Sequence, residues 1–290
     1  MRIDAHHHFW QPARGDYFWL RADDPAVAPL RRDFAPADLT PLRAVHGVAQ
    51  TVLVQAADTV AETDFLLAIA REHAFVGGVV GWVDLAGTSA VADLDRLAGQ
   101  PRFKGVRPML QDLPEADWIA RAPRADALAA LQRLGLRFDA LVKPWHLQPL
   151  LDFVRRHPGL PVVVDHAAKP QLAQGWAAGW APAWREGLAA LARCPNVVCK
   201  FSGLLTEMSP AQRATRDTAL ATLRPVWDTL LEAFGPPRLM WGSDWPVLTL
   251  ADSYAGWVDL ADALVGELSV PEQAAVRVDT AARFYGLAVP

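Results

Sequence analysis

Near the N-terminus an HxH pair follows a short apolar segment, and this pair has the residue types and spacing to do chemistry. The chain begins MRIDAHHHFW, so His6 and His8 are separated by one residue. Because side chains alternate between the two faces of a strand, His6 and His8 are predicted to share a face and His7 to point the other way. Two imidazoles on one face can chelate a metal ion or orient a substrate carbonyl.

Further polar residues follow apolar runs along the chain, which is typical of strands that end at an active site. Several such residues at one barrel mouth favour catalysis, whereas a single buried one is more often structural. Arg107 and Lys200 could instead each belong to a structural ion pair at the rim, and Asp165 could orient its neighbours or cap a helix. The residues are Arg107 in FKGVRP, Lys143 and His146 in LVKPWH, Asp165 and His166 in PVVVDHAAKP, Lys200 in VVCKFSG, and Asp244 in MWGSDWP.

Strands that end at a common edge are needed to bring these residues together. Short β-rich runs alternate with stretches of helical periodicity, which predicts a parallel sheet. About eight such strands predict a single (β/α)8 barrel over residues 1–290, with its active site at the C-terminal strand ends. An open doubly wound sheet is the competing fold, but no GxGxxG motif follows the first strand. The predicted strands lie near Arg2–His6, Thr51–Gln55, Val76–Trp82, Phe103–Arg107, Phe138–Val142, Pro161–Asp165, Val197–Phe201 and Leu239–Gly242, and the helical stretches include Glu62–Glu72, Arg124–Leu134, Trp184–Ala192 and Thr215–Phe234.

Composition excludes several classes of protein. Hydrophobic residues make up 52% of the chain and charged residues 21%, as expected for a globular protein. The net charge of −4 and the lack of a Lys/Arg cluster argue against nucleic-acid binding. No apolar run reaches the roughly 20 residues that cross a membrane, and the N-terminus lacks signal-peptide order. The two cysteines, Cys194 and Cys199, form no CxxC motif, so we expect a cytoplasmic protein without a catalytic thiol.

Five motifs resemble the amidohydrolase superfamily, in order from the first predicted strand to the last. They are DAHHHFW, FKGVRPMLQD, VVVDHAAKP, VCKFSGL and MWGSDWPV. Within that superfamily the chain resembles the sugar-lactonase branch, which contains L-fuconolactonase and L-rhamnonolactonase. The resemblance covers essentially the whole chain. It implies a (β/α)8 barrel that hydrolyses a bond at a carbonyl carbon, with an aldonolactone such as L-fucono- or L-rhamnonolactone as substrate.

The resemblance also implies a set of metal ligands: His6, His8, His166 and Asp244. Superfamily members with two metals have a further histidine after strand five and a bridging residue after strand four. Here Lys143 and Arg107 stand at those places, and cationic side chains bridge metal ions poorly. We therefore expect either a single divalent ion, zinc by ligand type, or chemistry without a metal. The sequence leaves these two alternatives open.

Lactone hydrolysis needs a base for water, donors for the carbonyl oxygen and a proton for the ring oxygen. Asp244 is the predicted base, because a carboxylate at the barrel mouth can take a proton from water and return it to the leaving alkoxide. His166, Arg107 and Lys143 are predicted to stabilise the tetrahedral oxyanion. No nucleophile elbow of the GxSxG type is present, which argues against a covalent acyl-enzyme.

Tryptophans near the predicted mouth can stack on sugar rings, although each can also be a packing residue. A Pro-rich segment, Pro12–Pro41, is predicted as a long functional loop. A separate stripe of Trp176, Trp180 and Trp184 has helical spacing and predicts either a core contact or a subunit contact in a homo-oligomer. The predicted substrate-binding residues are Trp10, Trp19, Trp145, His146, Lys200 and Trp245.

Two alternatives to a sugar lactonase remain. The first is a hydrolase of an aromatic-pathway lactone, of the pyrone-dicarboxylate or muconolactone type. Such substrates carry extra carboxylates and need more arginines than this rim supplies. The second is a sugar-binding barrel that has lost its chemistry, which the presence of Asp244 disfavours.

Overall fold

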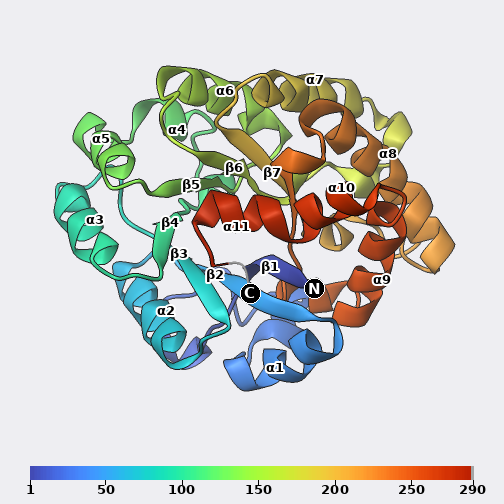
Figure 1. Ribbon diagram of the computed structural model, residues 1–290, viewed down its shortest axis with the longest axis horizontal. Coiled ribbons are helices and arrows are strands. Elements are labelled where there is room, and N and C mark those ends of the chain that lie inside the picture. Colours follow the sequence, from blue (N-terminus) through green and yellow to red (C-terminus); the bar gives the residue numbers. More distant parts are fainter. Residues whose placement is uncertain (289–290) are drawn as a thin grey trace.

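Eight parallel strands form the centre of the structure, and each pairs with the next along the chain (Figure 1). The computed structural model describes residues 1–288. Between β1 and the segment after β8 the barrel closes through backbone hydrogen bonds, from His8 N to Trp245 O at 2.7 Å and from Asp244 N to His6 O at 2.8 Å. The predicted (β/α)8 barrel is confirmed. The strands are β1 (Arg2–His7), β2 (Val48–Val54), β3 (Val76–Gly81), β4 (Phe103–Val106), β5 (Arg137–Ala140), β6 (Val162–Val164), β7 (Val197–Phe201) and β8 (Leu239–Trp241).

Helices surround the strands, and their buried faces follow from sequence patterning. In α2, for example, Thr59 caps the first turn by accepting from Glu62 N at 3.0 Å, while Leu66 and Leu67 pack inward. None of the described helices is long and apolar enough to cross a membrane. The helices are α1 (Pro36–Val45), α2 (Val60–Glu72), α3 (Ala90–Ala98), α4 (Trp118–Arg121), α5 (Ala125–Arg133), α6 (Leu147–Arg156), α7 (Ala181–Ala192), α8 (Arg216–Phe234), α9 (Tyr254–Val265), α10 (Val270–Ala274) and α11 (Thr280–Tyr285).

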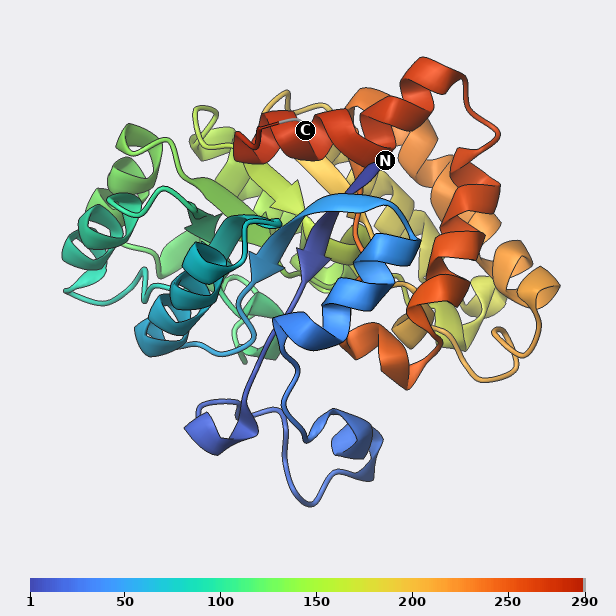
Figure 2. The same ribbon diagram turned by 60° about the horizontal axis from the view of Figure 1, so that its bottom comes forward.

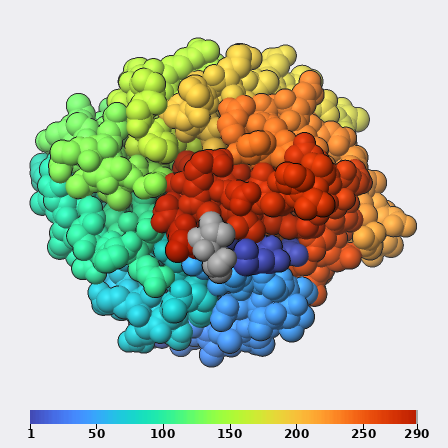
Figure 3. Space-filling model, in the orientation of Figure 1, coloured from blue at the N-terminus to red at the C-terminus, as the bar shows by residue number. Residues whose placement is uncertain are grey.

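The C-terminal helix α11 crosses the N-terminal end of the barrel (Figures 1 and 2). Its Ala281 and Tyr285 belong to one buried cluster with Val52, Val163 and Met240 from the strands. In the space-filling view this C-terminal segment covers the centre of that face (Figure 3). The opposite, C-terminal end is therefore the mouth at which a site can open.

The segment after β1 projects beyond the C-terminal ends of the strands (Figure 2). Its base is held by a pair of backbone hydrogen bonds between Trp10 and Phe34, at 3.0 and 3.1 Å. The loop is shorter than predicted, because α1 begins at Pro36 within the Pro12–Pro41 segment. Proline suits the first turn of a helix, since the N–H it lacks has no partner there.

The tryptophan stripe forms a packed cluster, but not on one continuous helix. Only Trp184 lies in α7. Gly175 and Gly179 adopt positive φ values of 78° and 84°, so the segment before α7 does not continue the helix. The rings of Trp176 and Trp180 lie 4.8 Å apart, and those of Trp180 and Trp184 lie 5.8 Å apart. Trp184 is fully buried, as a core role requires.

Candidate active site at the barrel mouth

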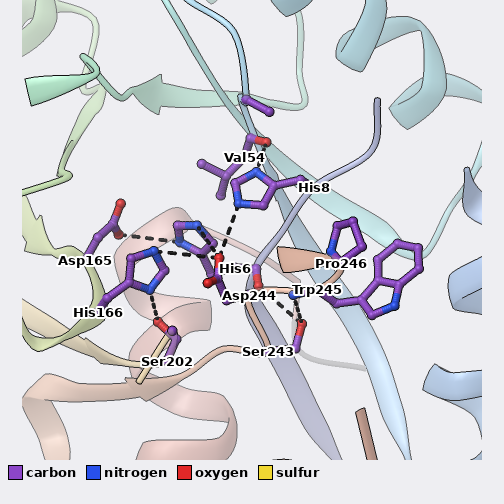
Figure 4. Close-up of polar contacts among 12 residues, drawn as sticks. His6, His8, Val54, Asp165, His166, Ser202, Ser243, Asp244, Trp245 and Pro246 are labelled. Carbon is purple, nitrogen blue, oxygen red and sulfur yellow. Dashed lines mark hydrogen bonds and ion pairs between the residues drawn. The ribbon is translucent and has the colours of Figure 1, made fainter. Parts of the chain in front are cut away.

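Three histidines converge on the carboxylate of Asp244 (Figure 4). Its Oδ1 lies 3.4 Å from His8 Nε2 and 3.7 Å from both His6 Nε2 and His166 Nε2. His7 points away and contacts Thr51 Oγ1 through Nε2 at 2.8 Å. The structure thus brings together the four residues that the sequence analysis grouped, from β1 and the residue that follows it, the turn after β6 and the segment after β8.

Asp4 ties together the two segments that carry this cluster. Its Oδ1 accepts hydrogen bonds from His6 N at 3.2 Å and Ser243 N at 2.8 Å. Its Oδ2 accepts from Tyr254 Oη at 3.0 Å. Burial raises the pKa of Asp4 to about 6, against the lowering effect of these donors. One carboxylate therefore fixes β1 beside the turn that leads to Asp244.

His166 reaches the site through an unusual backbone turn. Residues 166–169 all have positive φ, between 48° and 59°, although none is glycine. The left-handed conformation costs roughly 1–2 kcal/mol per such residue, so surrounding contacts must hold it. Ser202 Oγ contacts His166 Nδ1 at 2.9 Å. A Cβ on Gly203 would lie 2.3 Å from the same nitrogen, so only glycine allows the approach.

A buried charge network lies beneath the histidines. Lys200 donates to Asp139 Oδ2 at 2.6 Å and to His6 Nδ1 at 3.0 Å, and forms an ion pair with Asp165 Oδ1 at 3.0 Å. Burial raises the pKa of Asp139 to about 6 despite the Lys200 charge. The pKa of Asp165 is held well below its ordinary value, because Lys200 and His6 outweigh the effect of burial.

This network corrects the prediction that Lys200 binds substrate. The Lys200 side chain is fully buried inside the barrel and does not line the pocket. The structural ion pair considered as its alternative is what the structure shows, although it lies deep in the barrel and not at the rim. Asp165 orients its neighbours by pairing with Lys200 and lying 3.5 Å from His6 Nδ1.

Arg107 stands on the pocket wall beside His6. Its Nη1 lies 3.4 Å from His6 Nε2 and 3.6 Å from Asp165 Oδ2, and its Nη2 donates to Gln55 O. A neutral imidazole has one nitrogen that carries a proton and one that accepts a hydrogen bond. His6 therefore cannot accept from both Arg107 and Lys200. We assign Nδ1 as the acceptor because the Lys200 contact is the shorter one, which leaves the proton on Nε2.

The site histidines are neutral at neutral pH. Burial lowers the pKa of His166 to about 4, and burial with the Lys200 charge holds the pKa of His6 well below its ordinary value. Burial also lowers the pKa of His8. Because His8 Nδ1 donates to Val54 O at 2.8 Å, its Nε2 presents a lone pair to the site. For Asp244, burial favours the neutral acid, but His166 leads the effects that outweigh burial and lower the pKa.

The donor types suit a divalent metal ion. One ligand atom each from His6, His8 and Asp244 lie within 4.8 Å of one another, and so do atoms from His6, Asp165 and His166. His8 Nε2 and Asp244 Oδ1 offer lone pairs without rearrangement. His6 can join them if its proton moves to Nδ1, where Asp165 Oδ1 lies 3.5 Å away, and if Lys200 then donates only to Asp139 and Asp165.

A pocket of about 140 Å³ opens over the cluster. Of the predicted residues, it takes in His8, Arg107, His166, Asp244 and Trp19, whose Nε1 donates to Ala56 O at 2.7 Å. Most of the remaining residues that line the pocket had no role in the sequence analysis, although the motifs FKGVRPMLQD and DHAAKP contain four of them. The lining residues are His8, Trp19, Ala56, Arg107, Met109, Gln111, Asp112, Leu141, His166, Lys169, Asp244 and Val247.

Two predicted sugar-stacking tryptophans lie outside this pocket, which corrects that prediction. Trp10 is fully buried, and its Nε1 donates to Leu30 O and Arg32 O, both at 3.1 Å. Trp245 is 3% exposed and packs edge-on against Phe34 with ring centres 5.4 Å apart. Both side chains support the loop after β1, so neither presents a face to a ligand.

Three other predicted residues lie at or near a neighbouring hollow, and two of them line it. Lys143 and Trp145 line it together with Lys169, which also lines the main pocket. Trp145 is 53% exposed, and the Lys143 ammonium lies 5.3 Å from its ring centre. His146 is buried behind them, where its Nδ1 accepts from Lys143 N at 3.0 Å. Lys143 is therefore not positioned beside the Asp244 carboxylate as an oxyanion donor.

Comparison with known proteins matches the chain to the family described as amidohydrolase, over residues 3–287. An L-fucono-1,5-lactonase from Burkholderia ambifaria is 46% identical over 260 residues, which cover 89% of this chain and 85% of that protein. An L-fucono-1,5-lactonase from Burkholderia multivorans is 39% identical over 100% of this chain and 97% of its own length. Among solved structures, an amidohydrolase from Burkholderia multivorans with bound zinc superposes with a TM-score of 0.90 at 37% identity, covering 99% of this chain and 100% of that one.

Proposed function

The chain belongs to the amidohydrolase family, and from this premise we propose that it is a cytoplasmic hydrolase that opens a sugar lactone to the aldonic acid. The observation that carries the proposal is the convergence of three neutral histidines on one carboxylate, with a guanidinium beside His6, in a chain 46% identical to an L-fucono-1,5-lactonase. The proposed substrate is L-fucono-1,5-lactone or a related aldonolactone such as L-rhamnonolactone.

Asp244 is the proposed general base. Its lowered pKa keeps it ionised at neutral pH, and His8 Nε2 offers a second acceptor 3.4 Å away. A water bound between them loses a proton to Asp244 as its oxygen bonds to the carbonyl carbon. Collapse of the tetrahedral intermediate breaks the bond from that carbon to the ring oxygen. The alkoxide takes the proton from Asp244, and the new acid ionises to a carboxylate.

His6 and Arg107 are the proposed donors to the oxyanion. The Nε2–H of His6 and the Nη1 of Arg107 lie 3.4 Å apart, so both can point at one oxygen. Because these donors are fixed by Lys200 and by Gln55 O before substrate arrives, they need little reorganisation during the reaction. His166, held by Ser202, contacts the same site from the other side.

A single divalent ion is compatible with this proposal, with zinc the best match to the ligands. His8, Asp244 and His6 would hold it, with His166 as the fourth ligand. When bound, it would polarise the carbonyl or acidify the water. The steps above use only the chain's own residues.

The charge of the pocket favours a neutral polyol over the pyrone-dicarboxylate type of lactone. Arg107 and Lys169 are balanced by Asp112 and Asp244 among the lining residues. A substrate with two or more carboxylates would meet these acids without enough cations to compensate.

A panel assay tests the proposal. Purified enzyme is given sugar 1,5- and 1,4-lactones and 2-pyrone-4,6-dicarboxylate, and acid release is followed with a pH indicator, with and without prior chelation. We expect the highest kcat/KM on a 6-deoxy-sugar lactone. Preference for the pyrone would support the aromatic-lactone alternative, and no turnover with retained sugar binding would support the non-catalytic barrel. Loss of activity on chelation, with recovery on adding zinc, would establish the metal.

A further inference from the structure

We infer that Lys169 and Glu207 form a polar wall that binds the hydroxyl groups of the sugar and so selects hydroxylated lactones, an inference that rests on the proposed function. Neither residue has a part in the chemistry above. Lys169 lies at the end of the left-handed turn after β6, and Glu207 ends the short 3-10 helix Leu205–Glu207 after β7.

The left-handed turn provides the first argument, because it places Lys169 in the pocket. Four successive residues with positive φ are costly, and the sequence HAAK contains no glycine or asparagine to ease them. The turn is closed by a hydrogen bond from Lys169 N to His166 O at 2.8 Å. Both His166 and Lys169 line the pocket as a result. Strain of this kind persists at functional sites, where it positions side chains.

The second argument is that the Lys169 ammonium keeps hydrogen-bonding capacity. Its ion pair within the described part of the chain, with Glu207 Oε1, is loose at 3.9 Å, and the two side chains are 20% and 25% exposed. Lys200, in contrast, is fully buried and donates to Asp139 and His6. Lys169 is thus the pocket lysine with donors left for a ligand.

The third argument is the chemistry of the pair. A hydroxyl group donates one hydrogen bond and accepts others, so an ammonium beside a carboxylate matches it in both directions. Burial raises the pKa of Glu207. A hydrogen bond from a ligand hydroxyl to the Glu207 carboxylate would lower that pKa again.

Position provides the fourth argument. Lys169 lines both the pocket over Asp244 and the neighbouring hollow, and Glu207 lines the hollow with the exposed ring of Trp145. A lactone whose carbonyl lies between Asp244 and Arg107 places its far ring carbons on one of the other walls. Lys169 and Glu207 form a wall on the side of the neighbouring hollow that offers both a donor and an acceptor.

The test compares two lactones that share the reacting group. L-Fucono-1,5-lactone carries ring hydroxyls, and δ-valerolactone carries none. For Lys169→Met and for Glu207→Gln, we expect the ratio of kcat/KM on the sugar lactone to kcat/KM on δ-valerolactone to fall about tenfold or more, mainly through KM. Lys104→Met is the matched control, because Lys104 lies near the start of β4 at the closed end of the barrel. Its ratio should stay that of the wild type.

The possible results separate this inference from the proposed function. An unchanged ratio in both folded variants, or an equal loss on the two lactones, would overturn the inference, since the residues would then be inert or part of the chemistry. If the wild type opens no sugar lactone, the proposed function fails and the wall has no hydroxyls to bind. Circular dichroism and melting temperature confirm that each variant is folded, and Lys169→Gln serves as the second variant at that position.

Discussion

At the residue scale, the site combines an ionised carboxylate with histidines that stay neutral. Burial is the main reason that the histidine pKa values are low, and His166 in turn stabilises the Asp244 carboxylate. A base with a lowered pKa is active in its deprotonated form, so activity is present above that pKa and is lost as the pH falls through it.

The pH dependence of kcat/KM follows from these shifts. His166, with a pKa of about 4, and Asp244, with a pKa below its ordinary value, do not titrate between pH 5 and 8. Burial also lowers the pKa of His8 from its ordinary value, so we expect kcat/KM to vary by about twofold or less between pH 7 and 8 and to fall at lower pH. Lactone loss measured as hydroxamate at constant ionic strength provides the profile. An acidic limb centred near pH 6.5 would show that an ordinary histidine controls the rate.

His7 provides a contrast with its two neighbours. It is fully buried, bonds Thr51 Oγ1 at 2.8 Å and packs edge-on against Phe9 with ring centres 4.7 Å apart. We expect His7→Ala to lower the free energy of unfolding by about 2–4 kcal/mol and to change kcat/KM by about threefold or less. Urea unfolding and lactone kinetics on the folded variant check this. A loss as large as that of His8→Ala would place His7 in the site.

At the element scale, the site depends on how β1 meets the turn after β8. Asp4 Oδ1 accepts from backbone N–H groups of both segments, at 3.2 and 2.8 Å. Asp4 does not line the pocket, so it is a positioning residue.

Asp4→Ala should lower kcat about tenfold or more, because the turn that carries Asp244 loses its anchor and two N–H groups lose their acceptor. Asp4→Asn keeps an oxygen at that position and should recover most of the rate. KM should change less than kcat in both variants. Equal kcat in folded Asp4→Ala and in the wild type would show that Asp244 is held in place by other contacts.

The sequence predicted the elements well because hydrophobic periodicity marks them directly. All eight strands overlap the predicted ranges, and β7 matches Val197–Phe201 at both ends. The convergence of His6, His8, His166 and Asp244 follows from strand alternation and from the barrel. The depth of a side chain inside the barrel and the local backbone conformation were not predictable in this way. Lys200 ends an apolar run as Arg107 does, yet it points into a buried network, and nothing in DHAAKP signals four left-handed residues.

At the scale of the whole molecule, the closed end of the barrel is connected to the site. Tyr285 of α11 donates to Asp139 Oδ2 at 2.7 Å, and the same oxygen accepts from Lys200 at 2.6 Å. Lys200 then contacts His6. The C-terminal helix thereby stabilises the charge network from the closed end of the barrel.

Tyr285→Phe should lower the free energy of unfolding by about 1–3 kcal/mol, because it removes a donor from a buried carboxylate. Tyr17→Phe is the matched control, since the buried Tyr17 hydroxyl has no hydrogen-bond partner within the described residues. Its stability should change by about 0.5 kcal/mol or less. Equal stability losses in the two variants, measured by chemical unfolding, would show that the bond to Asp139 contributes nothing.

The central claim is that Asp244 activates water for attack on a sugar lactone. The most direct measurement is kcat on L-fucono-1,5-lactone for wild type and Asp244→Asn, with the melting temperature measured in parallel. The amide has nearly the same shape but cannot take a proton, so we expect kcat to fall by about a hundredfold or more while the variant remains folded. Turnover by Asp244→Asn at the wild-type rate would contradict the account and remove Asp244 from the mechanism.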